Sequence, residues 1–294
     1  MLEKKVGKSF IILGMGYVSG KHIQAIKSIG GNLIAYHDIM SVLGHVDSYF
    51  LDALYYPEFL SFDCFIDRHQ QEGNKIDYAV ILLPNHLHNP AARWAMNRGM
   101  DVIVEKPLVL YEKNLDELKE VEERTGKKVN TILQMRLHPE TDKMIYDLKQ
   151  SKHPQSSNVE ISYYAPRGHW FRHDGGWKSD IKKSGGIATA IGVHLFDLAS
   201  FVFGNLHIHR IDFISQDSIE GTLDLEYANV KWKLSVDPRA KQTRIFKVNN
   251  ELYDFTNGFG DLHIESYRQI LAGNGFGIED ARIGIRICER IRGS

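Results

Sequence analysis

The sequence has little cysteine and almost no net charge. Two cysteines, Cys64 and Cys288, lie far apart in a chain of 294 residues and lack a Cys-x-x-Cys spacing. This pattern argues against a disulfide framework and a thiolate zinc site, and reduced thiols indicate a cytoplasmic protein. The formal net charge of -1 gives no overall field to attract nucleic acid or an anionic membrane. An anionic ligand must therefore be met by local positive groups.

Long apolar stretches are absent as well. Residues 1–8 are charged and lead directly into a short strand, without the apolar stretch and cleavage site of a signal peptide. No later run approaches the length of a membrane span. With 43% hydrophobic and 25% charged residues the composition is that of an ordinary globular protein, and the length favours two domains. We expect no membrane, no nucleic acid and no bound metal.

Strands and helices alternate over the first part of the chain. A helix should follow the first strand, and the other expected helices cover 59–72, 90–98 and 114–125. The expected strands are 9–13, 32–38, 77–83, 100–104 and 128–134. Such alternation predicts parallel β-α-β units, and hence an α/β fold with a doubly wound Rossmann sheet in a first domain of residues 1–134.

The pattern changes after about residue 150. Strands without helices between them are expected at 158–164, 208–215, 221–227, 230–236 and 243–248, with helices at 193–203, 263–271 and 279–291. Apolar residues alternate with polar ones in these strands, which predicts a sheet with one covered face. Ala228-Asn229 is the expected hairpin turn. The second domain, residues 135–294, should be an α+β domain with a large, mainly antiparallel open sheet.

A dinucleotide signature joins the first strand to the first helix. Gly14-Met15-Gly16-Tyr17-Val18-Ser19 is a Gly-x-Gly-x-x-Ser turn, whose amide groups and helix dipole can hold a pyrophosphate. Asp38 ends the next strand, where an acid accepts the ribose hydroxyls and repels a 2'-phosphate, so NAD is favoured over NADP. A plain tight turn and a solvated Asp38 are the alternatives.

Polar residues also follow the strand that ends near Leu82. Leu83-Pro84-Asn85-His86-Leu87-His88 would lie beside the nicotinamide half of a dinucleotide. The alternative is a loop in which Asn85 or Asn89 caps the next helix.

Glu105-Lys106-Pro107 closes a buried apolar strand. A lysine at this position must pair with another group or take part in proton transfer, because an unpaired buried ammonium is strongly disfavoured. An ion pair with Glu105 or a helix end would explain it, and so would catalysis at the edge of an α/β sheet.

Two features of the second half carry further polar groups. His194 and Asp197 are one helical turn apart, a spacing that lets a carboxylate orient a general base, although a lone histidine there is more often a core residue. Residues 166–183 combine Arg167 and Trp170 with other cations, aromatic rings and glycines. Such a loop suits an anion and a flat ring. A solvated surface loop is the alternative, and the balanced net charge disfavours nucleic acid.

These motifs together resemble the Gfo/Idh/MocA oxidoreductase family. The likeness rests on the Gly-x-Gly loop, Pro84-Asn85 with His88, Glu105-Lys106-Pro107, and Gly192-Val193-His194 with Asp197. Within the family the chain is similar, nearly end to end, to the WlbA/WbpB type of UDP-GlcNAcA 3-dehydrogenase, on segments 132–136, 167–171, 191–194, 234–237 and 258–263. Ala190 departs from the pattern, since many members carry an acid four residues before the histidine.

The resemblance implies NAD-dependent oxidation of the C3 hydroxyl of UDP-N-acetylglucosaminuronic acid (UDP-GlcNAcA) to the 3-keto sugar, for bacterial surface polysaccharide (O-antigen) synthesis. Lys106 and His194 would be catalytic, and the sequence does not rank them as the base. The cofactor would be held by Gly14, Met15, Gly16, Tyr17, Asp38, Leu83, Pro84, Asn85, His88, Glu105, Lys106 and Gln134. The sugar nucleotide would be held by Lys106, Arg167, Trp170, Ala190 and His194.

The resemblance also implies partners and leaves alternatives. The partners are a UDP-hexuronic acid and, in some relatives, 2-oxoglutarate as the oxidant that recycles NADH. A homo-oligomer, tetramer or dimer, is expected to pack through an open sheet face rich in Leu, Val and Trp. Another sugar or cyclitol dehydrogenase of the family is the main alternative, and a non-catalytic NAD-binding regulator is a weaker one.

Overall fold

The computed structural model describes residues 7–40, 43–150, 157–167 and 176–293. The chain divides into two compact units that interleave in the sequence. Unit 1 contains residues 1–105, 116–132 and 263–278, and unit 2 contains residues 106–115, 133–262 and 279–294. Each unit is described by itself. The expected domain boundary after residue 134 stays a prediction about which segments fold independently.

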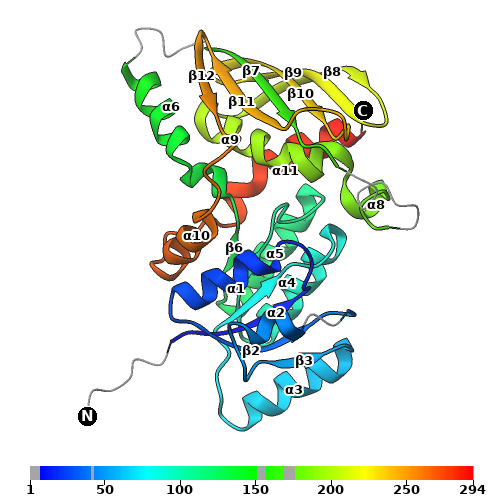
Figure 1. The fold of residues 1–294 in the computed structure, drawn as a ribbon, viewed down its shortest axis with the longest axis vertical. Helices are drawn as coiled ribbons and strands as arrows, with labels where there is room; N and C mark the ends of the chain where they lie inside the picture. Colours follow the sequence, from blue (N-terminus) through cyan, green and yellow to red (C-terminus); the bar gives the residue numbers. More distant parts are fainter. Residues whose placement is uncertain (1–6, 41–42, 151–156, 168–175, 294) are drawn as a thin grey trace. The chain divides into compact units, whose positions relative to one another are not determined.

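Unit 1 is built on a parallel sheet. Within the described residues it has six strands in the order β3-β2-β1-β4-β5-β6. Figure 1 labels β2, β3 and β6 of this sheet. The strands are β1 (Ser9–Leu13), β2 (Asn32–His37), β3 (Leu54–Tyr56), β4 (Tyr78–Ile81), β5 (Asp101–Val104) and β6 (Val129–Thr131). All their pairings are parallel, which confirms the doubly wound Rossmann sheet.

The helices of this unit follow the strands in the chain. They are α1 (Ser19–Ser28), α2 (Leu43–Asp47), α3 (Phe59–Gln71), α4 (His88–Asn97), α5 (Glu112–Thr125) and α10 (Leu262–Leu271), and α5 and α10 extend into the segments of unit 2. Side chains from β1, β4 and β5, such as Phe10, Val80 and Ile103, are fully buried in one apolar cluster. The sequence pattern missed α2 and β3, because each is short.

One expected strand is shorter than its pattern suggests. A strand was expected over 128–134, but β6 ends at Thr131. Gln134 instead opens a 3-10 turn, η2 (Gln134–Leu137), in unit 2. The short apolar stretch Ile132-Leu133 does not distinguish the end of a strand from a buried turn that follows it.

Unit 2 is built on a mixed, mainly antiparallel sheet. Its described strands are ordered β12-β11-β7-β10-β9-β8. They are β7 (Ser157–Tyr164), β8 (Leu206–Ile214), β9 (Ser218–Leu225), β10 (Ala228–Ser235), β11 (Thr243–Val248) and β12 (Glu251–Asp254). β7 and β10 pair in parallel and the other neighbours pair antiparallel. The described helical segments are α6 (Pro139–Gln150), α8 (Ile181–Ser184), η3 (Ala188–Gly192), α9 (Val193–Phe203) and α11 (Ile278–Gly293).

The hairpin between β9 and β10 turns earlier than predicted. Leu225 pairs with Ala228, so the turn residues are Glu226-Tyr227 and Ala228-Asn229 already belongs to β10. Neither turn residue has positive φ, so the turn does not require the glycine or asparagine that would have marked it in the sequence.

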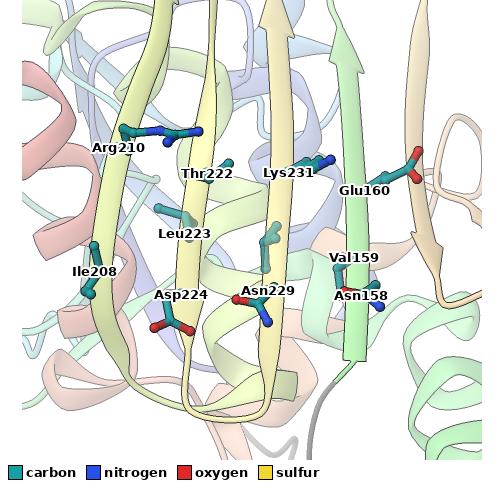
Figure 2. A pocket seen from close by; sticks show the side chains of 11 residues that line it. Asn158, Val159, Glu160, Ile208, Arg210, Thr222, Leu223, Asp224, Asn229 and Lys231 are labelled. Carbon is teal, nitrogen blue, oxygen red and sulfur yellow. The ribbon is translucent and has the colours of Figure 1, made fainter.

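The open face of the second sheet is mainly polar, with Ile208, Phe213 and Leu252 as exposed apolar residues, so the expectation of a Leu-, Val- and Trp-rich open face was wrong. Val230, Trp232 and Leu234 are each at most 2% exposed and belong to the core. Figure 2 shows the other face, where Arg210, Thr222, Lys231 and Glu160 form one row across β8, β9, β10 and β7. The period of two predicted the alternation, but it did not tell which face is covered.

One helical segment of unit 2 is long and apolar. Ile181–Phe203 is long enough, and its most apolar 18-residue window is apolar enough, to cross a membrane by length and composition alone. Because 67% of its apolar window is buried inside the protein, it has the burial of a core helix. A single segment of this kind, found in the described part of the chain, is weak support for a membrane span.

A buried ion pair holds α9 against η2. Arg136 donates from Nη2 to Oδ1 of Asp197 at 2.7 Å and from Nε to Oδ2 at 3.0 Å, and it also pairs with Asp280 on α11. The side chains of Arg136 and Asp197 are only 5% and 3% exposed. Without Asp197 the buried guanidinium would keep only the partly exposed Asp280 as a charged partner, and a poorly compensated buried charge costs far more than losing a surface pair.

Replacing Asp197 by alanine should therefore lower the free energy of unfolding by about 3–5 kcal/mol. The matched control is Asp67→Ala, which removes a half-exposed partner at 2.9 Å from Arg98 and should cost less than about 1 kcal/mol. Urea unfolding followed by fluorescence measures both. Equal, small losses in the two variants would show that the buried pair does not stabilise unit 2.

Candidate functional site

The glycine loop of unit 1 has the shape that a dinucleotide requires. Gly14 has φ +93°, and a Cβ there would lie 2.7 Å from the carbonyl group of Leu82. Its amide nitrogen donates to the carbonyl oxygen of His37 at 2.8 Å. A Cβ at Gly16 would meet no atom within 4 Å, so this side of the loop is open to a ligand. Glycine is thus required at the first position by packing, and at the second it leaves room for close approach.

The helix that follows the loop presents its N-terminus without a side-chain cap. α1 starts at Ser19, its N-cap residue Val18 makes no side-chain hydrogen bond, and its first turn holds no acid. Tyr17 is 96% exposed beside it. Uncapped amide groups at a helix N-terminus suit an anionic pyrophosphate.

Asp38 is joined directly to this loop. Its Oδ2 accepts a hydrogen bond from the amide of Met15 at 2.5 Å, and its Oδ1 accepts one from the amide of Met40 at 2.8 Å. The carboxylate is therefore held at the end of β2, where a ribose-binding acid is expected, and the alternative of a merely solvated residue does not describe it. The loop, the helix start and Asp38 together fit NAD.

The segment after β4 is also ordered by its own polar groups. Asn85 and His88 are buried, and Nε2 of His88 lies 2.7 Å from the carbonyl oxygen of Leu83. The N-cap positions of η1 (Asn85–Leu87) and α4 are occupied by Pro84 and Leu87, and not by Asn85 or Asn89. The function of this loop as a nicotinamide contact stays a prediction.

Glu105, at the end of β5, is bound by two histidines of unit 1. Its Oε1 lies 3.1 Å from Nε2 of His22 and 3.0 Å from Nε2 of His263. Burial raises the pKa of the Glu105 carboxyl, but the two histidine hydrogen bonds outweigh it and hold this pKa well below its usual value. Glu105 is therefore a buried carboxylate.

In unit 2 the amine of Lys106 contacts the helix that carries His194. Nζ of Lys106 donates to the carbonyl oxygen of Ala190 at 3.1 Å. Ala190 lies in the π-helical turn η3, and wide turns of this kind often occur at functional sites. His194 follows four residues later, in the first turn of α9. The structure thus brings Lys106 to the backbone of Ala190, four residues before His194 in the same helical segment.

Asp197 has a different principal partner from the one its spacing suggested. Both of its carboxylate oxygens accept hydrogen bonds from Arg136, as described above. A spacing of one helical turn therefore did not identify the group that Asp197 binds.

Positive charge gathers around Lys106 within unit 2. Burial, and then the charges of Arg167 and Lys106, lower the pKa of Lys178 to about 8. Sequence reasoning named Arg167 and missed Lys178, although both belong to the same basic and aromatic segment. Trp170 lies outside the described residues. Cations that raise one another's energy in this way favour binding of an anion.

Gln134 offers a further polar group. Its amide oxygen is buried and has no hydrogen-bond partner among the described residues. A buried acceptor without a partner is costly, so it suits a ligand that donates a hydrogen bond. Its assignment to the cofactor stays a prediction.

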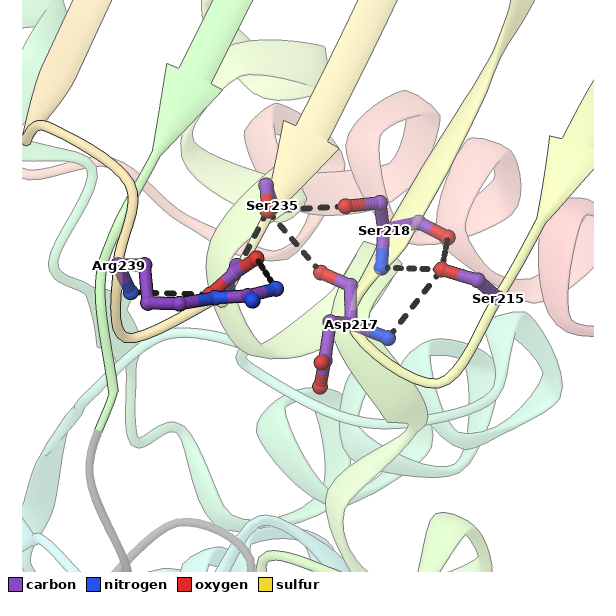
Figure 3. Close-up of polar contacts among 6 residues, drawn as sticks. Ser215, Asp217, Ser218, Ser235 and Arg239 are labelled. Carbon is purple, nitrogen blue, oxygen red and sulfur yellow. Dashed lines mark hydrogen bonds and ion pairs between the residues drawn. The ribbon is translucent and has the colours of Figure 1, made fainter.

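A hollow of about 440 Å³ in unit 2 is bordered by Lys178 and Arg292. One wall is the turn between β8 and β9, which Figure 3 shows tied to the end of β10. There, Ser218 donates to Ser235 at 2.9 Å, and Ser215 accepts from the amide of Ser218 at 3.0 Å. This network fixes the wall, and the two cations give the hollow a positive side.

Two family models match the chain over more than half of its length. The first describes an oxidoreductase family with an NAD-binding Rossmann fold and matches residues 8–133. The second describes the C-terminal alpha/beta domain of the same family, Gfo/Idh/MocA, and matches residues 158–235. Both halves of the predicted fold class are therefore confirmed.

Solved structures include a strong match. The WlbA (WbpB) dehydrogenase from Thermus thermophilus, solved with NAD and alpha-ketoglutarate and also with NAD and UDP-GlcNAcA, is 38% identical with a TM-score of 0.92. The alignment covers 97% of this chain and 94% of that one. The resemblance inferred from the motifs is thus confirmed.

Curated relatives match over shorter stretches. An uncharacterized oxidoreductase, ORF334, from Rhizobium meliloti is 38% identical over 26% of this chain. A putative UDP-kanosamine synthase oxidoreductase subunit from Amycolatopsis mediterranei is 26% identical over 49% of this chain. The matched parts span only 23% and 39% of the lengths of these two relatives.

Proposed function

We propose, on the basis that this chain belongs to the Gfo/Idh/MocA oxidoreductase family, that it oxidises the C3 hydroxyl of UDP-GlcNAcA to a ketone with NAD as the oxidant. The T. thermophilus relative, which was solved with NAD and UDP-GlcNAcA, supports this choice of substrate. NAD, when bound, accepts the hydride that leaves C3. The product would be a 3-keto sugar for bacterial surface polysaccharide, or O-antigen, synthesis.

The observation that carries the proposal is the contact of Lys106 with η3 beside a group of cations. Oxidation of an alcohol needs a group that takes the hydroxyl proton and a group that stabilises the charge on its oxygen. Lys106 and His194 are both titratable, and one carbonyl, that of Ala190, fixes the amine one helical turn before the imidazole. A non-catalytic regulator would not require this pair.

We assign the base to His194 and the stabilising hydrogen bond to Lys106. The reference pKa of a histidine, about 6.5, lies close to a neutral working pH, so the imidazole can accept the proton and release it again. An ammonium group can donate to the same substrate oxygen while its carbonyl contact holds it in place. The alternative, in which Lys106 is the base, requires a neutral amine.

The anionic groups of the substrate would be met by Arg167 and Lys178. UDP-GlcNAcA carries a diphosphate and a carboxylate, and an arginine can donate two hydrogen bonds to either one. Binding of an anion would relieve the repulsion that lowers the pKa of Lys178. A neutral cyclitol would not reduce the repulsion between these cations, so a charged substrate fits better.

Further parts of the proposal follow from the family. The second known ligand of the T. thermophilus relative, alpha-ketoglutarate, is a dianion, and we propose that it serves here as the oxidant that regenerates NAD. We also propose a cytoplasmic location and a homo-oligomer, either a dimer or a tetramer. If the open face of the second sheet forms the contact between subunits, charged side chains such as Lys231 and Glu160 must pair across it.

The substrate assignment predicts a selective reaction. NADH formation should be seen with UDP-GlcNAcA, and not with UDP-GlcNAc or myo-inositol. Lys106→Met and His194→Asn should each reduce kcat about 100-fold or more, which is the usual contribution of a proton-handling group. NAD affinity should stay within about threefold of the wild-type value, because neither change touches the glycine loop.

The control for these variants is Lys182→Met, which removes an exposed lysine on α8 and should leave kcat unchanged. Turnover of inositol in preference to the uronate would point to the cyclitol alternative. Wild-type turnover in both active-site variants would contradict the catalytic roles assigned here.

The lowered pKa of Lys178 predicts a pH-dependent KM. The amine is charged below a pH of about 8 and binds an anion, and it loses this charge as the pH rises through that value. The KM for UDP-GlcNAcA should therefore rise between pH 7 and pH 9, approaching about tenfold per pH unit at the upper end. In Lys178→Met the KM should already be high at pH 7 and should not change over this range. A wild-type KM in that variant at pH 7 would exclude a function for Lys178 in binding.

A further inference from the structure

Unit 1 contains a buried cluster of titratable groups that no step of the proposed reaction uses directly. His22, Glu105 and His263 are 0%, 7% and 3% exposed. They come from α1, from the residue that follows β5, and from α10, so three distant parts of the chain meet there. The carboxylate is placed immediately before Lys106 in the sequence, and α1 is the helix that starts at the glycine loop. The cluster therefore connects the helix that follows the glycine loop with the end of the strand that leads to Lys106.

The distances assign the protons of the cluster. A carboxylate only accepts hydrogen bonds, so the Nε2 atoms at 3.1 Å and 3.0 Å from its Oε1 must both carry a proton. Burial lowers the pKa of His22, which favours the neutral ring, so Nδ1 carries a lone pair and the hydroxyl group of Tyr267, at 2.9 Å, donates to it. Nδ1 of His263 is buried and has no hydrogen-bond partner among the described residues. The network thus runs in one direction, from Tyr267 through His22 to Glu105, with His263 as a second donor.

A metal ion is the competing explanation for two histidines and a glutamate. Their ligand atoms all lie within 4.8 Å of one another, which is close enough for one cation. Zinc ligands at about 2.0–2.1 Å in a tetrahedron are about 3.3 Å apart, whereas separations of 3.0–3.1 Å are those of ordinary N–H···O bonds. A metal would also need lone pairs on both Nε2 atoms, so that the protons would be on Nδ1. The position of the protons therefore distinguishes the two explanations.

We propose that His22 and His263 are positioning residues that fix the Glu105 carboxylate. Tyr267 supports them by donating a hydrogen bond to His22. A fixed Glu105 in turn fixes the end of β5, immediately before Lys106. The proposal rests on the proposed function in one respect, namely that Lys106 acts in the reaction. Two charge-assisted hydrogen bonds to one carboxylate oxygen hold that side chain in a single orientation. The backbone at this point is fixed as well, since the amide of Glu105 donates to Ile81 at 3.1 Å.

The first test needs no substrate and reads the protons directly. In protein labelled with ¹⁵N at histidine, long-range ¹H–¹⁵N NMR spectra report which ring nitrogen carries the proton, and His22→Gln and His263→Gln assign the two signals. We expect the Nε2–H form for both rings. Protons on Nδ1, together with one equivalent of metal by elemental analysis, would overturn the proposal in favour of a metal site. Because no turnover is involved, this result stands even if UDP-GlcNAcA is not the substrate.

The second test separates positioning from stability. A glutamine amide can present an N–H near the place of a histidine Nε2, and leucine cannot, so His263→Gln is the conservative variant and His263→Leu is the deletion. We expect kcat to fall about tenfold or more in His263→Leu, with both KM values within about twofold, and to return to within about threefold of wild type in His263→Gln. An unchanged kcat in His263→Leu, or an equal loss in both variants, would overturn the proposal.

Glu105→Gln keeps the proposal testable if His263→Leu does not fold. It preserves the size of the side chain but removes the charge that both histidines bind. We expect the same pattern, a kcat reduced about tenfold with KM values near those of wild type. A kcat equal to that of wild type would show that the orientation of this carboxylate is not needed, and would contradict the assigned positioning.

Discussion

Buried charges in this protein must be compensated by hydrogen bonds or by an opposite charge. These pairings determine where the expected catalytic residues lie. Removing an ion from water costs several kcal/mol unless hydrogen bonds or an opposite charge replace the solvent. In unit 1 the carboxylate of Glu105 is compensated by His22 and His263. In unit 2 the guanidinium of Arg136 is compensated by Asp197. The first pairing connects the residue after β5 to helices α1 and α10, and the second connects the turn η2 to helix α9. In both cases the partners lie far apart in the sequence.

Where like charges lie close together, the structure favours an anionic ligand. Lys178 has its pKa lowered by burial and by the charges of Arg167 and Lys106, and an anionic substrate would reduce this repulsion. The buried amide oxygen of Gln134 has no partner in the described part of the chain, so it suits a ligand that donates a hydrogen bond, such as the cofactor expected there. The charge pattern therefore agrees with a sugar nucleotide better than with a neutral sugar.

Much of unit 1 could be predicted because its signals are local. The strand before Gly14, the helix after Ser19 and the acid at Asp38 are fixed by periodicity and by the geometry of the turn, all within 30 residues. Short elements such as β3, of three residues, carry too little pattern to be detected. In unit 2 the alternation of Val230 and Trp232 with polar residues predicted the strand, while the covered face depends on what packs against it.

The parts of the site that escaped prediction depend on long-range contacts. Glu105 is 83 residues from His22 and 158 from His263, and nothing in either local sequence distinguishes those histidines from ordinary core residues. The turn at Glu226-Tyr227 was misplaced by two residues for a related reason, because the pairing of the strands and not the turn residues sets the register. Lys178 was overlooked because its lowered pKa depends on charges brought near it by the fold.

The central claim is that this chain removes hydrogen from C3 of a UDP-hexuronic acid. It is tested most directly with UDP-GlcNAcA that carries deuterium at C3, incubated with the enzyme and NAD and analysed by mass spectrometry. The account predicts that the deuterium is found in the reduced nicotinamide and that the sugar product has lost it. Reduced cofactor without deuterium, formed while the sugar retains its label at C3, would contradict the claim.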